Sequence, residues 1–85
     1  MNTRIALIGL IVEDLNAVSQ LNNILHTYGE YIIGRMGVPY KERGISIISV
    51  AVDAPSDLIS AMSGKLGAIP GVSSKTIYSK VGADG

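Results

Sequence analysis

Two long apolar runs, which begin 40 residues apart, constrain the fold of this chain more than any other feature. They cover residues 5–12 and 45–52, and nearly every position in each is apolar, with many β-branched residues. This pattern is typical of strands that are buried on both faces. A helix-like segment and then another strand-like segment follow each run, so the chain repeats a strand–helix–strand unit.

The first helix is expected over residues 15–28. Apolar side chains recur there in steps of three and four residues, at Leu15, Val18, Leu21, Ile24, Leu25 and Tyr28. Asp14 stands where a side-chain oxygen caps the first free amides of a helix. Gly29 stands where a residue in the left-handed conformation often ends one.

The second helix is expected to start within residues 53–57, with Pro55 at its first position and Asp57 in its first turn. Lys65 in the last turn and Gly67 just beyond it mark its end. Its buried stripe is predicted to consist of Leu58, Ile59, Met62, Leu66 and Ile69.

Residues 30–40 and 72–81 are expected to form the remaining strands, with a turn at residues 41–44. Gly34 and Gly37 would weaken a central strand and Pro39 cannot donate to one, so residues 30–40 are predicted to be an edge strand with a bulge. Strict alternation would place Ile32, Gly34, Met36 and Val38 on one face of it. Residues 72–81 are more polar, which favours a position at the other edge of the sheet.

This element order predicts an α+β fold of the ferredoxin-like βαββαβ type. Right-handed crossovers give one four-stranded antiparallel sheet in the order 4-1-3-2, with both helices on the same face. The two apolar runs then become the central strands, and the two strands with glycine, proline or polar residues become the edges. One domain is expected over residues 1–81, followed by a flexible tail at residues 82–85.

The predicted fold leaves one face of the sheet bare. Apolar side chains of the central strands would form a larger exposed patch than monomers usually carry, and 85 residues bury only a marginal core of their own. Gly9, Ser49 and Ala51 would let another layer approach closely. We therefore expect a homo-oligomer, a dimer or a tetramer, that buries this face.

The composition excludes several classes of protein. There is no cysteine, so disulfides and thiolate chemistry are absent, in agreement with the cytoplasmic location that we expect. Seven basic residues balance seven acidic ones, which predicts no direct binding of nucleic acid. No apolar run approaches the roughly 20 residues of a membrane helix, and the first run is interpreted as a strand and not a signal peptide.

Side chains that can bind a ligand are most concentrated in residues 26–40. The candidates are His26, Tyr28 and Arg35, with a small anion as the expected ligand of the Arg35 guanidinium. Each has a structural alternative: His26 as a favourable helix-end residue, Tyr28 as a core residue and Arg35 as a charge that protects an edge strand.

Catalytic and cofactor signatures are missing, so no enzyme activity and no cofactor are predicted. One histidine without cysteine makes no metal site within a single chain, although one shared across subunits stays open. The segment Ser63-Gly64-Lys65-Leu66-Gly67 lacks the earlier glycine and the hydroxyl residue of a phosphate-binding loop. Glu13, Asp14 and Asp53 stand at helix starts, where capping accounts for them.

The chain resembles a family of small bacterial proteins described as regulators of the iron-only hydrogenase system. The resemblance covers residues 3–80 and is carried by residues 26–40, 45–53, 63–67 and the start of the last strand. That family is similar in fold to ACT domains and to the C-terminal domain of the nickel-responsive repressor, which forms tetramers. The resemblance implies an ACT-like regulatory domain, with a role in ligand sensing or assembly.

Two departures limit what the resemblance implies. The nickel repressor binds its metal through several histidines and a cysteine, and this chain has only His26. ACT domains often bind amino acids at a glycine-containing turn after the first strand, and residues 12–16 contain no glycine. The leading hypothesis is therefore a non-catalytic regulatory oligomer. The alternatives are an adaptor that binds a protein partner through a sheet edge and an enzyme that uses the sheet face.

Overall fold

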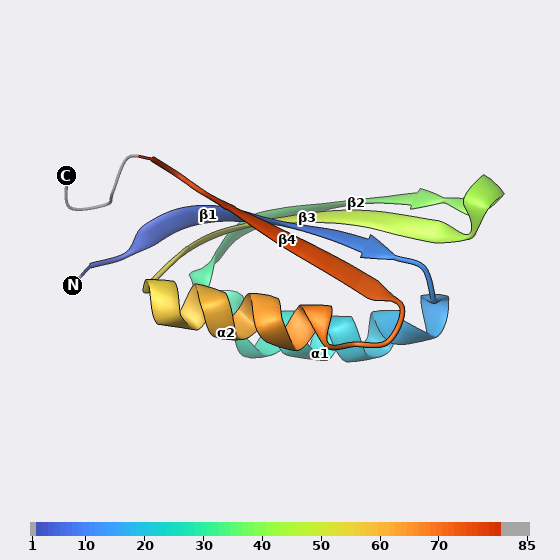
Figure 1. Ribbon diagram of the computed structural model, residues 1–85, viewed down its shortest axis with the longest axis horizontal. Coiled ribbons are helices and arrows are strands. Elements are labelled where there is room, and N and C mark those ends of the chain that lie inside the picture. The colour runs from blue at the N-terminus through green and yellow to red at the C-terminus, as the bar shows by residue number, and fades with distance from the viewer. Residues whose placement is uncertain (1, 81–85) are drawn as a thin grey trace.

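The computed structural model describes residues 2–80 and shows a four-stranded antiparallel sheet with two helices on one face (Figure 1). The strand order is β2-β3-β1-β4, which confirms the predicted ferredoxin-like topology and its order. The predicted tail at residues 82–85 lies outside the described residues. The strands and long helices are β1 (Arg4–Val12), α1 (Val18–Thr27), β2 (Ile32–Tyr40), β3 (Ile45–Ala54), α2 (Ser56–Gly67) and β4 (Val72–Tyr78).

Burial alternates strictly along the central strand β1. Ala6, Ile8, Leu10 and Val12 are buried beneath the helices, whereas the residues between them face the other side and are exposed. Strand β3 follows the same alternation from Ile48 to Ala54, except that Ser49 and Ala51 are half-buried. The prediction that these strands are buried on both faces is therefore wrong for the single chain, because the helices cover one side only.

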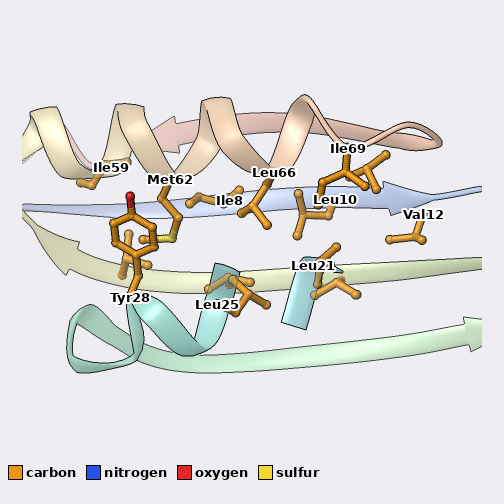
Figure 2. Close-up of a cluster of buried hydrophobic side chains, with 14 of the residues drawn as sticks. Ile8, Leu10, Val12, Leu21, Leu25, Tyr28, Ile59, Met62, Leu66 and Ile69 are labelled. Carbon is orange, nitrogen blue, oxygen red and sulfur yellow. The ribbon is translucent and has the colours of Figure 1, made fainter. Parts of the chain in front are cut away.

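The core fills the layer between the sheet and the two helices (Figure 2). Leu21 and Leu25 enter it from α1, and Ile59, Met62 and Leu66 enter it from α2, as the helical spacing predicts. Leu15 is the exception, with 60% of its surface exposed. The turn that Asp14 caps is a 3₁₀ helix (Leu15–Ala17), and its tighter winding takes Leu15 off the stripe that continues along α1.

Two details of the helix ends differ from expectation. Gly29 does not adopt the left-handed conformation; it opens a 3₁₀ turn (Gly29–Tyr31), and β2 begins at Ile32 instead of residue 30. Pro55 precedes the first helical residue of α2 and adopts an extended conformation, so it acts as the N-cap. In both cases the turn is formed by slightly different residues than expected, and the topology is unchanged.

The edge strand β2 contains the predicted bulge. Ile32 pairs with Val52 and Gly34 with Ala51, so Ile33 is an extra residue in the strand. Because the bulge changes the alternation, Ile32 lies on the helix side, whereas Gly34 and Met36 lie on the other side. The prediction that these three residues share one face is wrong, since it assumed an uninterrupted strand.

Gly71 closes the loop between α2 and β4 at a point of very tight backbone contact. Its φ is +84°, and a Cβ atom placed on it would lie 2.6 Å from Cβ of Asp14. The carbonyl of Gly71 accepts a hydrogen bond of 2.7 Å from the amide of Glu13. This contact joins the end of β1 to the start of β4, and it requires a residue without a side chain.

Candidate functional site

Tyr28 is part of the hydrophobic core. Only 8% of its surface is exposed, and its ring points from the end of α1 towards α2 (Figure 2). Its hydroxyl accepts a hydrogen bond of 3.0 Å from Nζ of Lys65, on α2. Tyr28 therefore joins the two helices, in agreement with its structural alternative, and its surface is little available to a ligand.

We predict that Tyr28→Phe lowers the free energy of unfolding by about 0.5–1 kcal/mol, because it removes one neutral acceptor from a half-exposed contact. Urea unfolding of the purified protein measures this change. Lys65→Met should have a similar effect, and the double variant should cost no more than either single one if the bond is the cause. Fully additive effects would contradict this role for the bond.

Arg35 and His26 are associated with a different side of α1 from the one that Tyr28 occupies. Arg35 pairs with Val50, which places its side chain on the helix side of β2, and its Nη2 donates a hydrogen bond of 3.2 Å to Oδ1 of Asn22. His26 follows Asn22 by one helical turn on the same side of α1. Both Arg35 and His26 are exposed. The structure thus associates Arg35 with the side of α1 that carries His26, and separates Tyr28 from both.

A cluster of hydroxyl groups between α2 and β4 was not anticipated from the sequence. Oγ1 of Thr76 donates to Oγ of Ser63 over 2.9 Å, and Oγ of Ser74 lies 3.2 Å from the same Ser63 oxygen. The sequence pattern could have revealed this cluster, because Ser74 and Thr76 are two positions apart and therefore lie on the same side of the last strand. These bonds attach the middle of the polar edge strand to α2, between Val72 and Tyr78, which pack against the core.

The side of the sheet without helices, here called the open face, is mostly apolar. Its central part is made of small residues, namely Gly9, Gly34, Ser49 and Ala51, which follow a diagonal across three strands. Large exposed apolar side chains surround them, namely Ile5, Leu7, Ile11, Met36, Val38, Tyr40, Ile47 and Ile77. In Figure 1 this face is the upper side of the sheet, opposite both helices.

Three shallow hollows border these small residues. Their volumes are about 250, 270 and 250 Å³, and the first contains Gly9, Ser49 and Lys75 in its lining. The second lies beside Gly34, and the third lies between Leu7 and Ile77. The open face therefore has projecting apolar side chains with space between them. The side chains of a second packed layer can fill that space.

Within residues 2–80, no group of three or more His, Asp or Glu side chains gathers that could hold a metal ion. The same residues contain no helix with the length and apolar character needed to cross a bilayer. Apart from the contact between Tyr28 and Lys65, the polar side chains described above form two separate sets. One is the exposed pair His26 and Arg35 beside α1, and the other is the hydroxyl cluster beneath β4.

Comparison with known proteins identifies relatives of the whole domain. A family model named TM1266-like and described as "Iron-only hydrogenase system regulator, putative" matches residues 4–76. No curated protein matches the chain. Among solved structures, the chain is similar to the uncharacterized protein TM1266 from Thermotoga maritima, with a TM-score of 0.88 and 37% sequence identity over 92% of this chain and 99% of that one. The similarity to ACT domains and to the nickel repressor stays a prediction. A match over most of the domain, in sequence and in fold, means that this chain belongs to the TM1266-like family.

Proposed function

We propose that this protein is a non-catalytic regulatory subunit of the iron-only hydrogenase system that works as a homo-oligomer and senses a small anion. The observation that carries the homo-oligomer, the main part of the proposal, is the open face. Its apolar side chains come from all four strands and surround a centre of small residues. A face with this composition is typical of a subunit interface and not of a solvated surface.

The energetics favour burial of this face by a second copy. Met36 and Ile77 expose 65% and 68% of their surfaces, and each square ångström of apolar surface removed from water contributes about 25 cal/mol. A small domain gains from such association, because its own core is limited by its size. Two sheets that pack face to face lie about 10 Å apart, a distance that the small central residues accommodate.

The anion-sensing part of the proposal rests on Arg35. Its guanidinium is exposed, and its hydrogen-bond partner Asn22 is uncharged, so this bond leaves the positive charge available. A planar guanidinium with free N–H groups favours carboxylates and phosphates, which it can bind through two parallel hydrogen bonds. His26, one turn along α1 from Asn22, is the second residue expected to contact the ligand.

Native mass spectrometry of the protein as purified tests the oligomer directly, since it reports the number of subunits and any retained molecule together. We expect a dimer or a tetramer at micromolar concentration. A stable monomer would overturn the oligomer and would favour an adaptor instead. The adaptor has one observation in its support, because β2 is exposed along most of its length and forms an edge of the sheet.

A thermal-shift series with amino acids, nucleotides and inorganic anions tests the sensing role. We expect at least one anion to raise the melting temperature, and Arg35→Ala to weaken its apparent affinity about tenfold, because it removes a charge-assisted hydrogen bond. Arg43→Ala is the matched control, since Arg43 is exposed in the turn between β2 and β3. Equal losses in both variants would contradict a specific role for Arg35.

A further inference from the structure

The first hollow on the open face exists because two facing positions of the central strands carry almost no side chain. Gly9 of β1 pairs with Ser49 of β3, and together they form the floor of this hollow of about 250 Å³. The next pair on the same face is Ile11 with Ile47, and these two apolar side chains form one wall. The hollow is therefore a gap in an otherwise apolar surface.

Polar groups line the side of the hollow formed by β4. Lys75 pairs with Gly9, and Ser73 pairs with Ile11, so both side chains lie on the open face. Among residues 2–80 the ammonium of Lys75 has no hydrogen-bond or ion-pair partner. The acidic residue Asp53 lies farther along the face, where it pairs with Ile5. The hollow thus presents a positive charge and hydroxyl donors beside apolar walls, with no acidic side chain in its lining.

We propose that this hollow binds a small carboxylic acid with an apolar body, held between the open faces of two subunits. The proposal rests on the oligomer proposed above and adds a ligand to its interface. Protein interiors are packed without large voids, so a gap of this size at a subunit interface is filled by a side chain, by ordered water or by a ligand, and its apolar walls disfavour water. The uncompensated charge of Lys75 favours an anionic ligand over an apolar side chain.

Shape and charge together limit the class of ligand. The hollow is smaller than the roughly 300–1,000 Å³ of pockets for drug-sized molecules, so the ligand is small. Ile11 and Ile47 would contact an apolar body, and Lys75 and Ser73 would donate to a carboxylate. A highly charged molecule such as a nucleotide would leave much of its polar surface against apolar walls, which is unfavourable.

Amide NMR spectra of nitrogen-labelled protein, titrated with hexanoate, test the proposal. We expect shifts centred on the amides of Gly9, Ser49 and Lys75, with much weaker effects of hexanol and none of hexylamine. Equal responses to all three compounds, or no response to hexanoate, would overturn the proposal. Sedimentation of the same samples reports the oligomer, so failure of the ligand site and failure of the oligomer are separate results.

Two variants distinguish a ligand from a side chain of the second subunit. A Cβ atom at Gly9 would lie 3.8 Å from the backbone oxygen of Lys75, which is ordinary van der Waals contact, and the methyl groups of Gly9→Val would occupy part of the floor of the hollow. We expect this variant to abolish the hexanoate shifts and leave the oligomer intact; dissociation would show that the partner fills the gap and would overturn the proposal. Lys75→Met should weaken hexanoate binding about tenfold. Lys41→Met, in the β2–β3 turn and outside the lining of the hollow, should not, and equal losses in the two variants would also overturn it.

Discussion

Gly71→Ala should lower the free energy of unfolding by about 2–5 kcal/mol, a large part of the stability of a domain of this size. Two costs add up at this position. The left-handed backbone, with φ of +84°, costs an L-residue about 1–2 kcal/mol. The new Cβ atom would also lie 2.6 Å from Cβ of Asp14 and 3.2 Å from its amide nitrogen, so the loop and the end of β1 must move apart.

Gly44→Ala is the matched control for this prediction. Gly44 also has a positive φ, +65°, but a Cβ atom there would meet nothing within 4 Å. It should therefore show the backbone cost of about 1–2 kcal/mol without the steric cost. Urea unfolding of the two variants measures the difference, and equal destabilisation would show that the contact with Asp14 relaxes freely.

Ile47→Glu should dissociate the oligomer, raising its dissociation constant about 100-fold or more. Ile47 lies on the open face between Ile11 and Val38, and 42% of its surface is exposed in the single chain. A carboxylate there stays hydrated in a monomer but would be buried without a partner between two apolar sheets, which costs several kcal/mol. Sedimentation velocity over a concentration series measures the change.

Leu15→Glu is the control for the open face. Leu15 is also a large exposed apolar residue, but it belongs to the 3₁₀ turn before α1 and not to the sheet. It should leave the oligomer unchanged, whereas Ile47→Glu should yield a folded monomer with the same circular dichroism as the parent. An oligomer that survives Ile47→Glu would place the subunit interface on another surface.

The topology could be read from the sequence because it depends on periodicity, which neighbouring residues define locally. The two apolar runs became β1 and β3, the central strands, and the segments with glycine, proline or polar residues became the edges. The buried stripes of both helices followed from the same rule. The predictions for Leu15 and Ile32 were wrong because a 3₁₀ turn and a bulge, respectively, change the periodicity over one or two residues.

The candidate site could be predicted only in part, because its geometry depends on residues far apart in the chain. Residue type identified Arg35 and His26 as groups that can bind an anion, and both are exposed beside α1. Tyr28 looked equally suitable, but its direction is set by the packing of α1 against α2, which buries it against Lys65. Such packing has no local signature in the sequence.

The sequence by itself determined the order of the strands, the layer of helices on one side and the bare apolar face on the other, since each follows from which residues avoid water. Only the tertiary structure decided that Gly71 must fit against Asp14 and that Gly9, Ser49 and Lys75 share one hollow. The physical reason is register: cross-strand pairing brings together residues that are tens of positions apart, and no local pattern specifies which of them become neighbours.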